Sequence, residues 1–292
     1  MRERWADEIT ARARAHWTDA RTAELARGKA LILPPADAAP LLRALGLLRA
    51  DASMPPDRVR KFFQVNHMVA LLGPALRELR AAHAEIELID AGCGRSYLSL
   101  ILAWVARHVW KQRLVVRGVD RNADVIDECR KRAELALLDD VATFEVGDVA
   151  AVAGDAHGVI ALHACDTATC DAIALGVALG AEMIAVAPCC QAELARAWAT
   201  SANGAFAPIH AMPHLRRETA AMITDAMRTL LLRGAGYEVL AMEFVPSEHT
   251  RKNTLIRAIK RAPDPSARAE YDALVAATGG AGLALATRVP GG

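Results

Sequence analysis

The chain has 292 residues, of which 53% are hydrophobic and 24% charged, and its net charge is +1 at pH 7. This composition is typical of a globular protein with a sizeable core and excludes an intrinsically disordered chain. The small net charge gives no overall attraction to polyanions, so a nucleic-acid partner would need a local basic patch. No stretch offers about eighteen uninterrupted apolar residues and no apolar signal region opens the chain, so we expect a cytoplasmic protein without a membrane partner.

The cysteines do not form the framework of a secreted, disulfide-rich domain. We expect free thiols at all six positions, which are Cys93, Cys129, Cys165, Cys170, Cys189 and Cys190.

The first 80 residues are predicted to be helical. Apolar residues recur at helical spacing from Trp5 to Trp17, a second apolar pattern covers 34–50, and a third helix is expected over 58–79. We expect a helical extension over 1–57, a main domain over 58–262, and a C-terminal helix, near 265–277, with a tail over 263–292.

From residue 85 onward, short β-rich runs alternate with helical windows. Strands buried on both faces and joined by helices imply a parallel sheet. The predicted strands cover 86–91, 114–120, 142–148, 158–164 and 182–188.

The end of this pattern distinguishes between α/β folds. A helix over 217–234 leads to predicted strands at 237–245 and 253–261, and the loop between them is too short for a crossover helix, so they must form a hairpin. A sheet whose last strand is antiparallel is the hallmark of the class I methyltransferase fold, a Rossmann-like α/β fold with seven strands.

The segment LIDAGCGRSY, residues 88–97, predicts a tight turn between the first strand and its helix. Gly92 and Gly94 suit positive φ angles or the close approach of a ligand to the backbone. A dinucleotide site would favour a third glycine at position 97, where Tyr97 stands, and this disfavours an NAD-dependent oxidoreductase.

Acidic residues close the first three predicted strands. Asp90 suits the amine of S-adenosylmethionine, Asp120 suits its ribose hydroxyls, and Asp148 suits its adenine amino group; the alternative for each is a helix cap or turn former. We expect the cofactor to be S-adenosylmethionine. The neighbouring residues expected to line its site are Cys93, Arg121, Val149 and His163.

Five segments carry a resemblance to a known family: LIDAGCGRSYLSLILA, GVDRNADVIDECRKRA, LHACDTATCDAIALG, MIAVAPCCQAEL and EHTRKNTLIRA. Over about residues 58–262 the sequence resembles the bacterial branch of a class I methyltransferase family that includes methyltransferase-like protein 25 and the tRNA 2′-O-methyltransferase Trm13. The resemblance implies cofactor binding by the glycine loop and the strand-end acids, and a reaction centre near the ends of the fourth and fifth strands.

The loop after the fourth strand presents His163, Cys165 and Asp166. The pKa of an ordinary imidazole lies near neutral pH, so His163 could accept a proton from a hydroxyl nucleophile, with Asp166 orienting it. The alternatives are a packing role for His163 and a helix cap at Asp166.

The fifth strand is followed by Cys189 and Cys190. With Cys165 they could supply thiolates for covalent catalysis. With Cys165 and His163 they could hold zinc, but adjacent cysteines chelate poorly and we expect no metal. We favour the interpretation that these cysteines are small buried thiols lining the pocket.

Two polar segments are candidates for substrate binding. Lys61 and Asn66 interrupt an apolar helix face, and Lys252 and Asn253 lie in the loop of the final hairpin; solvated surface accounts for either segment equally well. A phosphate-binding rim could be formed by Arg216, Arg217, Arg251, Lys252, Lys260 and Arg261, and the alternative is an ordinary solvated face.

We therefore predict an S-adenosylmethionine-dependent methyltransferase that acts on RNA, with a tRNA ribose hydroxyl as the leading acceptor. Two alternatives stay open: methylation of a small molecule or protein, and a non-catalytic cofactor-binding scaffold. The oligomeric state is not predicted.

Overall fold

The structure, a computed structural model, describes residues 2–162, 167–188, 191–200, 204–244 and 253–289. Contacts divide the chain into two compact units, Met1–Gly147 and Asp148–Gly292. This division into units does not test the expected segment boundaries at 57/58 and 262/263, which stay a prediction.

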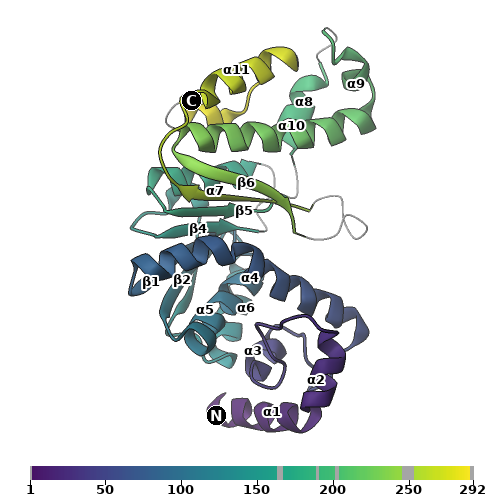
Figure 1. Cartoon of the computed structure of the whole chain (residues 1–292), viewed down its shortest axis with the longest axis vertical. Coiled ribbons are helices and arrows are strands. Elements are labelled where there is room, and N and C mark those ends of the chain that lie inside the picture. The colour runs from purple at the N-terminus through teal and green to yellow at the C-terminus, as the bar shows by residue number, and fades with distance from the viewer. Residues whose placement is uncertain (1, 163–166, 189–190, 201–203, 245–252, 290–292) are drawn as a thin grey trace. The chain divides into compact units, whose positions relative to one another are not determined.

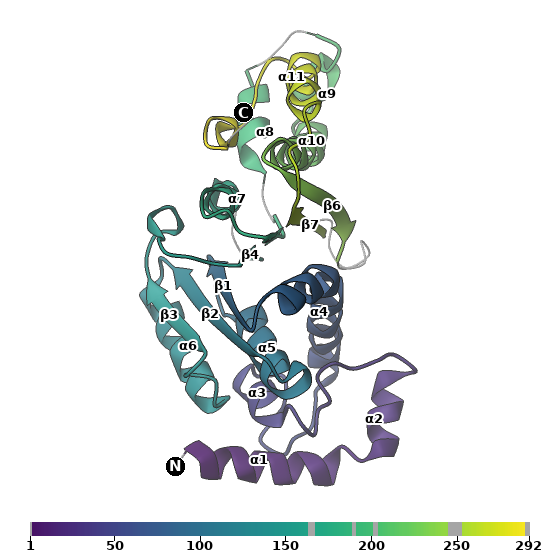
Figure 2. The same cartoon turned by 60° about the vertical axis from the view of Figure 1, so that its left-hand side comes forward.

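The first unit begins with a helical extension: α1 (Arg2–His16), α2 (Asp19–Ala26) and α3 (Ala39–Ala44), followed by the long α4 (Pro56–Ala82). Figures 1 and 2 show α1 to α3 below α4. The extension has a leucine interior that is fully shielded from solvent, formed by Leu33, Leu41, Leu42, Leu45, Leu47 and Leu48. Burial of this apolar surface, rather than helix propensity, holds the short helices in place.

The sheet of the first unit has the order β3-β2-β1 and is parallel, with β1 at Glu85–Ala91, β2 at Arg113–Asp120 and β3 at Ala142–Val146. Helix α5 (Tyr97–Val105), continued by a π-helical turn η1 (Ala106–Trp110), connects β1 to β2, and α6 (Ala123–Leu135) connects β2 to β3. Both helices pack on β2 and β3, and α4 packs on β1 and α5. The carboxyl ends of β1 and β2 therefore lie side by side, where Asp90 pairs with Gly118.

The second unit contains the strand order β4-β5-β7-β6, with β4 at Gly158–Ala161, β5 at Met183–Val186, β6 at Tyr237–Glu243 and β7 at Thr254–Lys260. Strand β4 pairs with β5 in parallel, whereas β7 is antiparallel to both β5 and β6. The described residues thus hold seven strands, three in the first unit and four in the second, and the last one is antiparallel. The expected α/β class I methyltransferase fold is confirmed.

Helices surround the strands of the second unit. The short turn η2 (Val149–Ala151) precedes β4, α7 (Thr167–Ala178) packs on β4 and β5, and α10 (Pro213–Gly234) packs on β6. In Figure 1, α8 (Ala192–Trp198), α9 (Ala207–Ala211) and α11 (Ala267–Ala277) gather around α10, and η3 (Ala284–Thr287) follows α11. Within the described part of the chain, no helix has both the length and the hydropathy needed to cross a bilayer.

Most expected elements are present, but several end earlier than predicted. Strand β3 stops at Val146: the Gly147 N–H makes the last ladder bond, to the Asp120 carbonyl at 3.0 Å, and Asp148 then caps η2. Strand β4 ends at Ala161 and β6 at Glu243. Helices α8 and α9 were not predicted, because they have only seven and five residues and too few turns for a clear period.

Candidate functional site

The glycine loop joins β1 to α5 in the first unit. Gly92 has φ +72° and Gly94 has φ +49°, both in the left-handed region that favours glycine. The backbone N–H groups of Gly92 and Cys93 both donate to the Val119 carbonyl, at 2.8 and 3.0 Å. The loop is therefore held against the end of β2.

Asp120, the last residue of β2, joins two loops through its carboxylate. Its Oδ2 accepts from the Gly94 N–H and its Oδ1 accepts from the Asn122 N–H, each at 3.0 Å. A carboxylate oxygen can accept more than one hydrogen bond, and Asp120 is only partly buried. The side chain can therefore shape the loop and still accept from a ligand hydroxyl.

Asp90, on β1, is 4% exposed and accepts a hydrogen bond from the Ser99 hydroxyl of α5. The pKa of Asp90 is raised to about 7, mainly by burial; the Ser99 hydrogen bond opposes this shift and the nearby charge of Asp120 adds to it. A cationic ligand group would stabilise the ionised form, which makes Asp90 suited to an ammonium. Sequence reasoning missed Ser99, whose only signal is a hydroxyl residue within an otherwise apolar helix.

Two thiols lie beneath the loop. Cys129 Sγ, on α6, donates to the Gly94 carbonyl at 3.1 Å. The hydrogen bond with Cys129, together with burial, raises the pKa of the Cys93 thiol. Both thiols are fully buried, so the structure places them as packing groups under the loop.

Tyr97 occupies the position where a dinucleotide loop would have glycine. Its hydroxyl donates to the Leu45 carbonyl at 2.8 Å, which links the helical extension to the start of α5. Lys61 Nζ lies 3.5 Å from the centre of the Tyr97 ring, a cation–π contact. The ammonium of Lys61 is thus beside the loop, but it is engaged by an aromatic ring.

Asn66 is buried, and its amide holds the segment that follows α2. Its Oδ1 accepts from the N–H groups of Ile32 and Leu33, at 2.9 and 3.1 Å, and its Nδ2 donates to the Phe62 carbonyl at 2.9 Å. Substrate binding by Asn66 would require some of these bonds to break. In the second unit, Asn253 Nδ2 donates to Glu243 Oε1 at 2.6 Å across the final hairpin.

Asp148 and Val149 open the second unit. The Asp148 carboxylate accepts from the Ala150 N–H at 3.1 Å and caps η2, and Val149 is buried. Arg121 is exposed directly after β2. The remaining predicted site residues lie outside the described residues: His163, Cys165, Asp166, Cys189, Cys190 and Lys252.

A buried polar network follows the loop after β5, and sequence reasoning missed it. Gln191 Nε2 donates to Asp225 Oδ2 at 3.1 Å, and Arg228, 1% exposed, forms an ion pair with Asp225 at 3.0 Å and donates to Cys170 Sγ at 3.4 Å. Burial raises the pKa of Asp225, against the effect of Arg228. The network ties α10 and α7 to the residue after Cys190. In the sequence, the only sign of this network is an Asp and an Arg three positions apart on the apolar face of a predicted helix.

A family of known proteins matches the part of the chain that contains the glycine loop. Residues 60–197 match the family described as a methyltransferase domain. This match contains the glycine loop, Asp90 and Asp120. The matched segment is similar to a methyltransferase domain. Together with the class I fold, this makes the chain a methyltransferase whose cofactor is S-adenosylmethionine.

The methyltransferase is also similar to solved structures at low identity. Magnesium protoporphyrin IX methyltransferase from Synechocystis, with bound SAM, is 16% identical, with 76% of this chain and 90% of that chain covered and a TM-score of 0.43. An SAH-bound methyltransferase of Podospora anserina is 12% identical, with 84% and 95% covered and a TM-score of 0.45. A TehB-like SAM-dependent methyltransferase from Corynebacterium glutamicum is 17% identical, with 71% and 100% covered and a TM-score of 0.33. No curated protein matches the sequence.

Proposed function

We propose that this methyltransferase acts on RNA and that its methyl acceptor is a ribose hydroxyl of tRNA. The observation that carries the proposal is the uneven distribution of charge. Residues 1–83 hold 14 Lys and Arg against 9 Asp and Glu, although the whole chain has a net charge of only +1. A basic region beside a cofactor site attracts a polyanionic substrate.

The residues of the first unit fit the proposed cofactor. The buried carboxyl of Asp90 would pair with the ammonium of S-adenosylmethionine, and Asp120 would accept from the ribose hydroxyls. Gly92 and Gly94, which lack side chains, allow the ligand to approach the backbone, with Cys93 and Arg121 beside them. Asp148 and Val149 are proposed to line the adenine.

The bound cofactor supplies an electrophilic methyl group on its sulfonium. We propose that His163 accepts the proton of the attacking ribose hydroxyl, so that the new O–CH₃ bond forms as the S–CH₃ bond breaks, and that Asp166 orients the imidazole. Lys61, Lys252 and Asn253 are proposed to contact the RNA. Cys165, Cys189 and Cys190 would line the acceptor pocket.

Mass spectrometry of modified nucleosides tests the substrate. Total RNA from cells with and without this gene should differ in one 2′-O-methylated nucleoside, and a His163→Ala copy should fail to restore it. If the two RNA samples are identical, the RNA substrate is wrong. Calorimetry with S-adenosylhomocysteine tests the cofactor site separately, because binding is expected whatever the substrate.

A further inference from the structure

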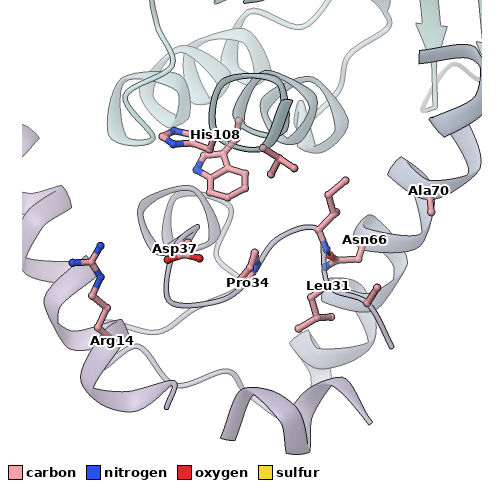
Figure 3. Close-up of a pocket in the computed structure, with 11 residues that line it drawn as sticks. Arg14, Leu31, Pro34, Asp37, Asn66, Ala70 and His108 are labelled. Atoms are coloured by element: carbon pink, nitrogen blue, oxygen red, sulfur yellow. Dashed lines mark hydrogen bonds between the residues drawn. The ribbon is translucent and has the colours of Figure 1, made fainter. Parts of the chain in front are cut away.

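A cavity of about 830 Å³ lies within the first unit, away from the glycine loop. Its walls come from α1, the segment 30–37, α4 and the end of α5 with η1 (Figure 3). The volume is in the range of pockets that hold small-molecule ligands. Nothing in the function proposed above uses this cavity.

One side of the cavity is polar. In Figure 3, Arg14, Asp37 and His108 lie on one side, and Leu31, Asn66 and Ala70 lie on the other. Within the described part of the chain, the side chains of Arg14 and Asp37 form no hydrogen bond and no ion pair. A guanidinium and a carboxylate are therefore both available to a ligand.

Planar and apolar groups complete the walls. His108 stacks on Trp104, with ring centres 4.8 Å apart and an angle of 25° between planes. Burial, with the positive charges of Arg107 and Lys111, lowers the pKa of His108 against the opposing charge of Asp37, which favours the neutral form of this ring. Val109, 47% exposed, lies on the same π-helical turn, a rare element that is frequent at functional sites.

The chemistry of these walls matches a nucleotide. Arg14 suits a phosphate, and the apolar and aromatic groups suit a base. The two oxygens of Asp37 suit adjacent N–H donors, which guanine presents at N1 and N2. The excess of basic residues over 1–83 favours the same anionic ligand.

We propose that this cavity binds one nucleotide of the RNA substrate, with guanine as the preferred base. The inference rests on the proposed RNA substrate. Ser96, at the glycine loop, and Ala106, at the start of η1, are ten residues apart along a helix, or about 15 Å. A nucleotide in the cavity is thus separate from the methyl acceptor, and it fixes the position of the RNA relative to the methyl group.

Calorimetry on the full chain tests the cavity, with saturating S-adenosylhomocysteine present so that the adenosyl site is filled. We expect GMP to bind more tightly than AMP or UMP. Arg14→Ala should weaken GMP binding about tenfold, the effect of losing one charge-assisted hydrogen bond. Asp37→Asn should remove the preference for GMP over AMP.

Arg4→Ala is the matched control, because Arg4 is exposed on the same helix and pairs with Glu8 at 3.3 Å, outside the cavity. It should bind GMP as the unmodified protein does. The proposal is overturned if GMP does not bind at millimolar concentration, or if Arg14→Ala and Asp37→Asn, with unchanged melting temperatures, bind GMP normally. An unchanged RNA methylation profile would instead contradict the proposed RNA substrate. Absence of S-adenosylhomocysteine binding would contradict the proposed cofactor site.

Discussion

The Asp120 carboxylate accepts a hydrogen bond from the Gly94 backbone N–H, with 3.0 Å between Oδ2 and N. This bond joins the end of β2 to the loop that follows β1. The same carboxylate is the proposed partner of the cofactor ribose. If Asp120 binds the ribose as proposed, loop geometry and ligand binding are coupled through one side chain.

Asp120→Ala should weaken S-adenosylhomocysteine binding by more than tenfold. The variant loses an acceptor for the ribose and also frees the Gly94 N–H, and each charge-assisted bond is worth about 1.5–3 kcal/mol. Titration calorimetry measures the effect. Asp124→Ala, an exposed acid in the first turn of α6, is the control and should bind normally; equal affinities in the two variants would contradict the assignment.

The alternation of strand and helix patterns and the final hairpin were enough to predict the fold, and the spacing of glycines and acids was enough to predict the glycine loop. Strand-end acids and positive-φ glycines are local features, and the sequence order places them at one edge of a parallel sheet. The contacts of Tyr97 and Asn66 could not be predicted in this way. Their partners, Leu45 and Ile32, lie in irregular segments more than 30 positions away, whose path depends on tertiary packing.

The affinity for S-adenosylhomocysteine should depend on the ionisation of Asp90. Its pKa is about 7, and only the ionised form pairs with the ligand ammonium. Affinity should therefore fall about tenfold between pH 8 and pH 6. Asp90→Asn should bind weakly at every pH, without this dependence, and a pH-independent affinity in the unmodified protein would argue against the Asp90–ammonium pair.

Asp90 should also destabilise the ligand-free fold at high pH. Its pKa is raised in the folded state, from 3.8 to about 7, so the folded protein binds the proton more tightly than the unfolded chain does. Its contribution to stability is thus present at low pH and is lost as the pH rises from about 4 to about 7. Asp90→Asn should melt higher than the unmodified protein at pH 8, and this advantage should shrink at pH 5; the opposite trend in thermal denaturation would show that Asp90 is stabilised as a carboxylate.

Gly118→Ala should disrupt the sheet beneath the glycine loop. A Cβ at this position would lie 2.5 Å from Phe144 Cδ1 and 3.1 Å from Cys93 Cβ. Overpacking of this kind costs about 1–3 kcal/mol, measurable by urea denaturation. Adding Phe144→Leu should recover part of the loss, whereas Gly73→Ala, where the new Cβ meets only the mobile end of Arg77, should not destabilise.

Arg228→Ala should be more destabilising than an arginine truncation on the surface of the same helix. It would leave Asp225 buried without its ion pair, and breaking a buried pair costs about 3–5 kcal/mol. Arg217→Ala, an exposed position on α10, should change stability by less than about 0.5 kcal/mol. The double variant Arg228→Met with Asp225→Leu removes both charges and should recover much of the loss, because the cost arises from the unpaired carboxylate. If the double variant is as unstable as Arg228→Ala, the loss comes from packing around the arginine stem instead.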